Sequence, residues 1–237
     1  RCTGGRTGRE RELGAIHRHV TIRRILLALD TATHSPAAFE AATLLAARLD
    51  AELHALFVED INLLCLAGLP FARETRLTSA TTRRLRNPDM ERALRAEAAR
   101  AQATLATLAT RQNVRWSFQV TRGQVATQVR AAATETDLVA LTFTGGAPAG
   151  LTHTAATLET LMCGAPYPLL VLPPGAGIHP PFVAVYDGSP ASAHALRLAA
   201  QLAQAEGESV TVLLAAIEPP ARRRLRAEAD ALLADRK

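Results

Sequence analysis

Short apolar runs alternate with helix-like patterns along the chain from residue 25 onward. The run "ILLAL" at 25–29 is apolar at every position, which is typical of a strand buried on both faces. An Ala-rich helical pattern follows at 36–49, and "ELHALFV" at 52–58 predicts a second strand. This alternation of strands and helices favours β-α units around a parallel sheet.

The pattern is interrupted at 59–86, where we expect a long excursion with one helical turn. Beyond it, Asn87 is expected to be the N-cap of a helix with Pro88 at its first position. The remaining segments predict three more strands at 115–120, 138–143 and 168–172, and helices that end near 112, start after Gly123 and span about 155–163. The sequence thus predicts five strands and four helices in the first 173 residues.

The pattern then starts again after a Pro- and Gly-rich stretch. With a constant offset of 157 residues, Asp30 aligns with Asp187 and Leu45 with Leu202, which indicates an internal repeat. We therefore expect a basic disordered arm at 1–20, a complete domain at 21–173, a linker at 174–181 and a truncated second domain at 182–237. The helical pattern after Pro219 has no evident surface to pack on.

Composition narrows the class of protein. The chain is 48% hydrophobic but has no apolar run long enough to span a membrane. Its three cysteines form no C-x-x-C pair, which disfavours a disulfide framework and a zinc site and predicts a reducing, cytoplasmic location. The net charge of +5 comes largely from the arm and from the clusters at 83–86 and 222–226, so we interpret it as solvated surface, with nucleic-acid binding as a minor alternative.

The segments "ILLALDTATHSPAAFEAATLLAARLDAELHALFVED", "VTRGQVATQVRAAATETDLVAL" and "CGAPYPLLVLP" resemble the universal stress protein family. The stretch "VYDGSPASAHALRLAAQLA" resembles the start of a second such domain, as in tandem members. The resemblance implies an α/β, Rossmann-like fold with a parallel five-stranded sheet in the order 3-2-1-4-5 and helices on both faces. In such sheets a ligand binds where the strand order reverses, outside the carboxyl ends of the strands.

In nucleotide-binding members, the resemblance implies that the Asp after strand one and the backbone after strand two hold the adenosine. A loop of pattern G-x2-G-x9-G-[ST] would hold the phosphates through its N–H groups. Those loop positions fall here on Thr142, Gly145, Ala155 and Ala156, so the spacing is kept while most of the glycines and the hydroxyl are lost. The candidate nucleotide-binding residues are Asp30, Val58, Thr142, Gly145, Gly146 and Thr157.

Two interpretations of Asp30 stay open: it binds a nucleotide, or it organises the turn before the first helix. No Lys or Arg occurs between Asp137 and Pro173 to neutralise phosphate charge. The favoured expectation is therefore a stress-response protein without a bound cofactor, which senses a small molecule and forms a homodimer through the strand at Pro168–Pro173. The alternative is an ATP-binding switch with slow hydrolysis.

Other chemistry has little support in the sequence. The chain lacks the G-x-S-x-G and G-x4-G-K-[ST] patterns, so we expect that it is not an enzyme. Its seven histidines are scattered and no metal site is expected, although His34 and His153 are the pair nearest to the predicted cleft.

Overall fold

The structure is a computed structural model that describes residues 22–29, 36–76, 81–84, 86–142, 153–162, 167–173, 175 and 177–234. The chain divides between Ile178 and His179 into two compact units. We call residues 22–178 the N-terminal unit and the described residues from 179 onward the C-terminal unit, and each is considered by itself.

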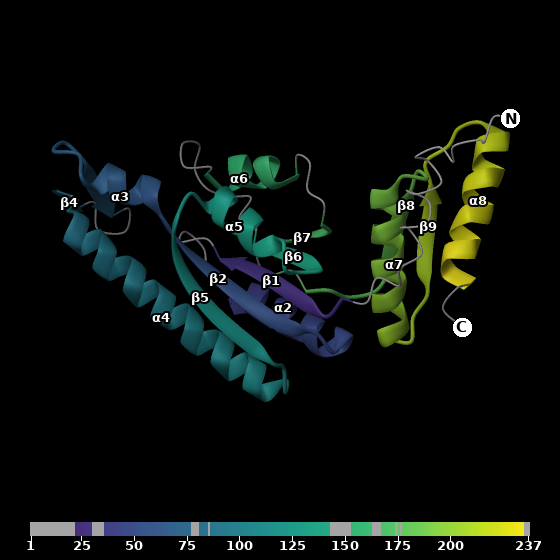
Figure 1. Cartoon of the computed structure of the whole chain (residues 1–237), viewed down its shortest axis with the longest axis horizontal. Coiled ribbons are helices and arrows are strands. Elements are labelled where there is room, and N and C mark those ends of the chain that lie inside the picture. Colours follow the sequence, from purple (N-terminus) through teal and green to yellow (C-terminus); the bar gives the residue numbers. More distant parts are fainter. Residues whose placement is uncertain are drawn as a thin grey trace, which may run out of the picture. The chain divides into compact units, whose positions relative to one another are not determined.

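The N-terminal unit is built on a five-stranded parallel sheet in the order β5-β2-β1-β6-β7. Numbered along the chain within this sheet, the order is 3-2-1-4-5, which confirms the predicted fold class (Figure 1). Its strands are β1 (Arg24–Leu29), β2 (Glu52–Asp60), β5 (Trp116–Gly123), β6 (Leu138–Thr142) and β7 (Leu169–Leu172).

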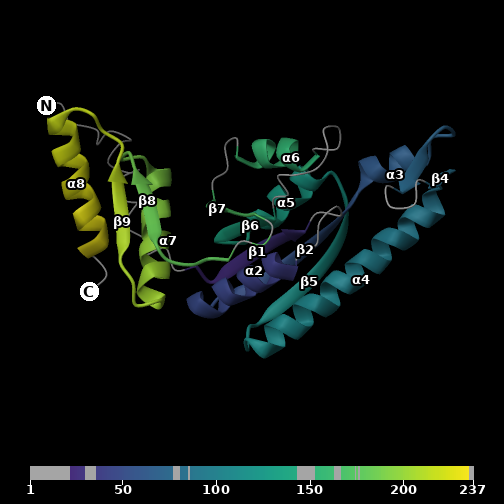
Figure 2. The ribbon, with the colours of Figure 1, turned by 180° about the vertical axis from the view of Figure 1, so that it is seen from behind.

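Helices cover both faces of this sheet. Seen from behind, α5 (Val125–Ala133) and α6 (His153–Met162) lie above the sheet, and α2 (Pro36–Leu49) and α4 (Asn87–Arg111) lie below it (Figure 2). A buried cluster joins the sheet to α5 and α6; its members are Leu26, Ala28, Leu56, Val58, Val129, Ala133, Val139, Leu141 and Leu161. Because neighbouring residues of a strand point to opposite faces, burial on both sides explains why the 25–29 run is apolar throughout.

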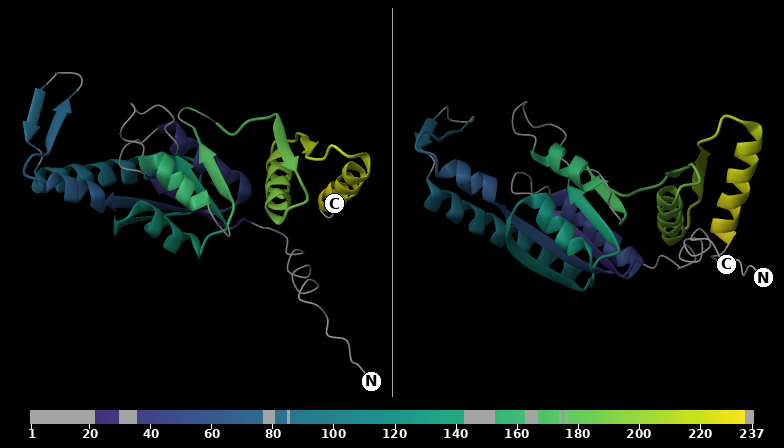
Figure 3. Two further views of the ribbon diagram at one scale, coloured as in Figure 1. Left: turned by 90° about the horizontal axis from the view of Figure 1, so that it is seen from above. Right: turned by 45° about the horizontal axis from the view of Figure 1, so that its top comes forward.

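The excursion after β2 is more ordered than the sequence predicts. In place of one helical turn it contains the seven-residue helix α3 (Ile61–Ala67) and a hairpin of β3 (Arg73–Arg76) and β4 (Thr81–Arg84). Asp60 ends β2 and accepts a hydrogen bond from the Asn62 N–H at 2.9 Å, which caps α3. Figure 3 shows the hairpin projecting from the end of the unit where α3 meets α4.

The predicted N-cap of α4 is wrong by one residue. Arg86 has the extended backbone of the N-cap, and it makes no side-chain capping bond. Asn87 already belongs to the helix, and Pro88 lies in the first turn, where its missing N–H costs no hydrogen bond.

The C-terminal unit consists of β8 (Phe182–Tyr186), α7 (Pro190–Ala205), β9 (Val210–Leu214) and α8 (Pro219–Ala234). The pairing of β8 with β9 starts at Phe182 and Val210, and the equivalent residues 157 positions earlier, Ile25 and Leu53, are paired between β1 and β2. All five pairs of β8 and β9 keep this offset, so the two units share the same β-α-β register.

The expectation that the last helix has no packing surface is wrong. The α8 residues Leu225 and Ala229 are 3% exposed and pack in one cluster with Tyr186 and Leu196. Burial of these side chains against α7 and the two strands gives the C-terminal unit a small core of its own.

Candidate functional site

The order of the strands reverses at β1, which lies between β2 and β6. β1 ends at Leu29, opposite Phe57 of β2, while β2 continues for three more residues to Asp60. On the other side, β6 ends at Thr142. The carboxyl ends of β2 and β6 therefore flank the end of β1, as expected for a ligand site at the switch point.

Val58 contributes backbone polar groups to this point. Its side chain is fully buried in the cluster beneath α5 and α6, so only its main chain is available to a ligand. The Glu52 N–H donates to the carbonyl of Arg23, which directly precedes β1, and the Leu53 N–H donates to the carbonyl of Arg115, which directly precedes β5. Successive residues of a strand direct their N–H and C=O groups alternately toward one neighbouring strand and the other. Val58 is an even number of residues from Glu52, so its N–H and C=O groups both point toward β1.

The equivalent bond in the C-terminal unit supports this direction. There the Ala215 N–H, 157 positions after Val58, donates to the Tyr186 carbonyl at 2.8 Å. By the same register the Val58 N–H is directed at the Leu29 carbonyl, and the Val58 carbonyl is directed past the last paired residue of β1. This carbonyl is a hydrogen-bond acceptor at the predicted adenosine position.

The N-terminus of α6 is the second part of the site. The helix starts at His153, so Ala155 and Ala156 lie in its first turn and not in a loop. The N–H groups of a first turn lack partners within the helix and favour an anionic group. Backbone donors thus remain at the predicted phosphate position, whereas Ala156 brings no hydroxyl.

The structure places the six candidate residues only in part. Val58 lies in β2, Thr142 is the last residue of β6, and Thr157 lies in the second turn of α6, although the side chains of both threonines are not described. Asp30, Gly145 and Gly146 fall outside the described residues. Of the two histidines nearest to the predicted cleft, His34 also falls outside, and His153 is described by its backbone only.

The position equivalent to Asp30 is described in the C-terminal unit. Asp187 accepts a hydrogen bond from the Ser189 N–H at 2.8 Å, and Ser189 in turn caps α7 through the Ser192 N–H at 3.1 Å. Hydrogen bonds from Ser189 and Ser192 lower the pKa of Asp187 from 3.8 to about 2. In this unit the Asp organises the strand-to-helix turn, which is one of the two roles considered for Asp30.

An ion-pair network holds the carboxyl end of the sheet on its α4 face. The Arg122 guanidinium contacts the Glu59 carboxylate at 2.9 Å and the Glu91 carboxylate of α4 at 3.4 Å. The hydrogen bond and charge of Glu59 raise the pKa of Arg122, so its positive charge is retained. Glu59 is only 8% exposed, and the contact with Arg122 offsets the hydration that its carboxylate loses on burial.

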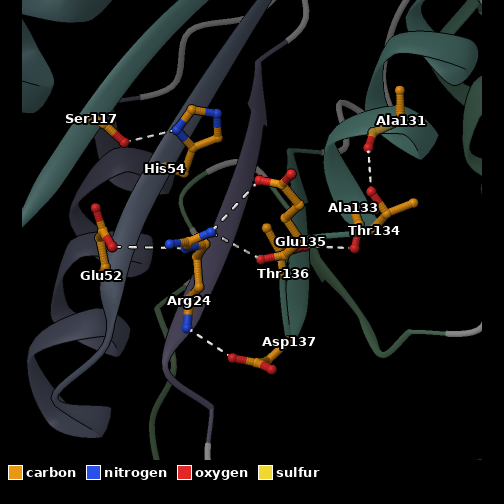
Figure 4. A network of polar contacts seen from close by, with 10 residues as sticks. All are labelled: Arg24, Glu52, His54, Ser117, Ala131, Ala133, Thr134, Glu135, Thr136 and Asp137. Carbon is orange, nitrogen blue, oxygen red and sulfur yellow. Dashed lines mark hydrogen bonds and ion pairs between the residues drawn. The ribbon is translucent and has the colours of Figure 1, made fainter.

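A groove that the sequence does not predict lies at the opposite, amino end of the sheet. Its volume is about 280 Å³, and it is lined by Arg24, Glu52, His54, Ser117, Gln119, Ala132, Glu135 and Thr136. Figure 4 shows Arg24 between the carboxylates of Glu52 and Glu135, 3.8 Å from each. His54 lies beside them, with its Nδ1 2.8 Å from the Ser117 Oγ.

The same network ties the start of β1 to β6. One carboxylate oxygen of Asp137 accepts the N–H groups of Arg23 and Arg24 at 2.9 and 3.0 Å. Figure 4 shows the bond from Arg24. The charges of the groove pair with one another, and its segments are distant in sequence, which is why no sequence motif marks it. We interpret it as a structural network at the start of the sheet.

Comparisons with known proteins give the fold an independent reference. No protein-family model matches the sequence, and no curated protein does. A universal stress protein from Archaeoglobus fulgidus aligns over 90% of this chain and 74% of its own length, with a TM-score of 0.64 and 13% identity.

Two further structures align with lower scores. A protein of the universal stress protein family from Burkholderia pseudomallei covers 65% of this chain and 97% of its own, with a TM-score of 0.45 and 22% identity. A universal stress protein in complex with cAMP covers 65% of this chain and 98% of its own, with a TM-score of 0.37 and 14% identity. At these identities a similarity of structure shows the fold and no more, and of these three the Archaeoglobus protein has a TM-score above 0.5.

The sheet order, the helices on both of its faces and this alignment agree with the family resemblance of the sequence. The chain therefore has the fold of the universal stress proteins.

Proposed function

We propose that this chain is a universal stress protein-like, stress-response protein that acts by self-association and not by turning over a substrate. The fold supports the family assignment. The observation that supports self-association is the position of β7 at the edge of the described sheet. A cytoplasmic location belongs to the same proposal and rests on the free, exposed Cys65. No helix within the described residues has the length and apolarity that crossing a bilayer requires.

The hydrogen-bonding groups of β7 are directed alternately at β6 and at the open edge. The Val139 N–H donates to the Pro168 carbonyl at 3.0 Å, so residue 168 faces β6 and residue 170 does likewise. Leu169 and Val171 then direct their N–H and C=O groups away from the sheet. Among the described strands none pairs with β7 on this side, and an open row of this kind is a template for pairing with the same strand of a second copy.

The residues at the predicted nucleotide position favour a protein that binds no nucleotide there. The Val58 carbonyl and the first turn of α6 keep two of the expected features of that position. Thr142 and Ala156 replace the glycine and hydroxyl of the family loop, and no Lys or Arg occurs from 138 to 172. Each lost hydrogen bond to a charged phosphate weakens binding by about 1.5–3 kcal/mol, so several losses exceed what the retained groups supply.

The absence of turnover is part of the proposal and rests on the sequence. The G-x-S-x-G and G-x4-G-K-[ST] patterns are missing from the sequence, and the segment from 138 to 172 contains no Lys or Arg. A small neutral molecule is the class of ligand that such a position would admit.

A proline at the outward-facing position of β7 tests the proposed dimer. Val171→Pro removes an N–H that points away from β6, so it should abolish pairing at the edge while it leaves the bonds to β6 in place. Val171→Ala is the matched control, because it shortens the side chain and keeps the N–H. We expect light scattering to show a smaller assembly for Val171→Pro than for the natural chain and Val171→Ala; equal masses for all three would refute an interface at β7.

A further inference from the structure

The connection between β2 and α4 is longer than the fold requires. In the C-terminal unit β9 ends at Leu214 and the next helix, α8, begins at Pro219. In the N-terminal unit β2 ends at Asp60 and α4 begins only at Asn87, although α4 packs on α2 as α8 packs on α7. The strands within 61–86, β3 and β4, pair with each other and not with the five-stranded sheet. This segment is therefore an addition to the arrangement that the two units share.

The first half of the addition exposes large apolar side chains. Ile61 and Leu66 of α3 are 41% and 45% exposed, and Leu69 and Phe71, which follow the helix, are 39% and 75% exposed. We call these four residues the apolar patch. No charged residue occurs from 61 to 72. Single exposed apolar residues are ordinary, whereas a group of them on one segment marks an interaction site.

Backbone turns keep the apolar patch compact and place it beside α4. The Leu69 N–H donates to the Leu66 carbonyl and the Ala72 N–H donates to the Leu69 carbonyl, each at 3.1 Å. Gly68 lies against the first residue of α4, since a Cβ at Gly68 would be 3.3 Å from Nδ2 of Asn87. The patch is thus close to the residues that directly precede α4.

Those residues belong to the second half of the addition, which is strongly cationic. The stretch 73–86 contains five Arg and one Glu. We call its arginines the arginine cluster; they are Arg73, Arg76, Arg83, Arg84 and Arg86. The side chains of Arg73 and Arg86 are exposed, and the hairpin register pairs Arg73 with Arg84. Because like charges directly opposite each other destabilise a strand pair, an anionic partner would stabilise this hairpin.

The carboxylates at the start of α4 already contact other arginines. Asp89 forms an ion pair with Arg92, and the Glu91 carboxylate lies 3.5 Å from the Arg95 guanidinium. These pairs lie within the helix, three and four residues apart. The positive charge of the arginine cluster therefore stays available to an anion from outside the chain.

We propose that the apolar patch and the arginine cluster together bind the surface of an anionic lipid bilayer, which the chain does not cross. Anionic headgroups bind arginines, and apolar side chains beside them enter the boundary between headgroups and acyl chains. A nucleic acid would bind the arginine cluster but leave the apolar patch in water. Figure 3 shows the hairpin projecting beyond the main sheet of its unit, so that sheet does not keep a flat surface away from it.

Flotation with lipid vesicles tests the proposal. The full-length chain is mixed with vesicles of phosphatidylcholine alone, or with vesicles in which roughly a third of the lipid is phosphatidylserine. We expect binding to the anionic vesicles only, and weaker binding as the salt concentration rises. Arg83→Gln combined with Arg84→Gln should lower the affinity about tenfold or more, because each change removes one attraction to the headgroups. Phe71→Ser should lower the affinity as well, since it removes the most exposed side chain of the patch.

The C-terminal unit offers matched controls. Arg223→Gln combined with Arg224→Gln removes the same charge from exposed positions of α8. Ile217→Ser removes an apolar side chain that is 89% exposed. Both controls should bind the anionic vesicles as the natural chain does, and circular dichroism verifies that every variant is folded. If the controls lose as much affinity as the test variants, the binding belongs to the charge and apolarity of the whole chain, and the proposal fails.

Insertion of the apolar patch has a direct readout. Phe71→Trp should show a blue shift of its fluorescence on the anionic vesicles, beyond any change in the natural chain, whose single Trp is Trp116. Absence of binding to anionic vesicles at low salt would overturn the proposal. So would unchanged binding of Phe71→Ser without a blue shift, because charge alone would then hold the chain. Release from the vesicles by a DNA duplex of arbitrary sequence, to which Phe71→Ser binds as tightly as the natural chain, would identify a nucleic acid as the partner instead.

Discussion

Gly188 occupies a backbone conformation and a space that other residues do not fit. Its φ is +85°, and a Cβ at this position would lie 2.8 Å from Cδ2 of Leu225. Leu225 is 3% exposed within the core of the C-terminal unit, so it has little room to move. Gly207, which follows α7, has a similar φ of +70° but no atom within 4 Å of such a Cβ.

We therefore predict that Gly188→Ala destabilises the C-terminal unit more than Gly207→Ala. The left-handed backbone alone should cost about 1 kcal/mol at either position, and the clash with Leu225 should add roughly 1–3 kcal/mol at Gly188. Urea unfolding of both variants and the natural chain measures the difference. Equal losses would show that the turn does not pack against α8 as described.

Asp187 makes the C-terminal unit sensitive to acid. Its pKa is lowered from 3.8 to about 2 in the fold, because hydrogen bonds from Ser189 and Ser192 stabilise the ionised carboxylate relative to the unfolded chain. Its contribution is complete above pH 3.8 and is lost as the pH falls toward 2. We predict that Asp187→Asn lowers the free energy of unfolding at pH 6 and that the gap to the natural chain narrows below pH 4, which urea unfolding at a series of pH values measures. A gap that stays constant with pH would contradict the hydrogen bonding of this turn.

At the scale of single residues, the sequence predicts which element contains a residue better than it predicts where a helix begins or which side chains pair. The spacing of the family loop falls on Thr142, which is the last residue of β6, and on Ala155 and Ala156, which lie in the first turn of α6. It did not indicate that α6 begins before Ala155, because helix ends depend on capping geometry that neighbouring residues decide. The pairing of Arg122 with Glu59 and Glu91 was also not predictable, since its members are far apart in sequence.

At the scale of elements, the long apolar and periodic segments were predicted closely. The helix at Pro36–Leu49 has the bounds that its pattern indicates, and strands β1, β6 and β7 differ from their predictions by one residue at one end. Burial on both faces makes these strands apolar throughout, so their signal is strong. β5 extends three residues beyond its predicted end. The sequence did not indicate this extension, because Arg122 is polar and Gly123 has no side chain, so the apolar pattern of a strand stops before them.

The excursion between β2 and α4 shows where this reasoning fails. Helix α3 contains apolar residues on its exposed side as well as its buried side; Ile61 and Leu66 are 41% and 45% exposed, and Leu64 and Ala67 are buried. Without an apolar and a polar face, no helical period is visible in the sequence. Strands β3 and β4 consist mainly of Arg and Thr, which give no period of burial either.

At the scale of the whole molecule, the two units share one register of strand pairing. The 157-residue offset aligns every pair of β8 and β9 with a pair of β1 and β2. The order of the strands in the N-terminal unit could not be derived from periodicity and came from the family resemblance.

The chain has the fold of the universal stress proteins, and we propose that it has lost the nucleotide site that the sequence resemblance implies. Calorimetric titration with ATP and magnesium tests this most directly, with the natural chain beside a variant that carries Thr142→Gly, Ala155→Gly and Ala156→Ser. We predict no binding to the natural chain up to about 1 mM ATP, and micromolar binding once the glycines and the hydroxyl are restored. Asp30→Ala in the restored variant should weaken that binding. Micromolar binding to the natural chain would show that it has kept a nucleotide site, for which Val58 and the first turn of α6 suffice.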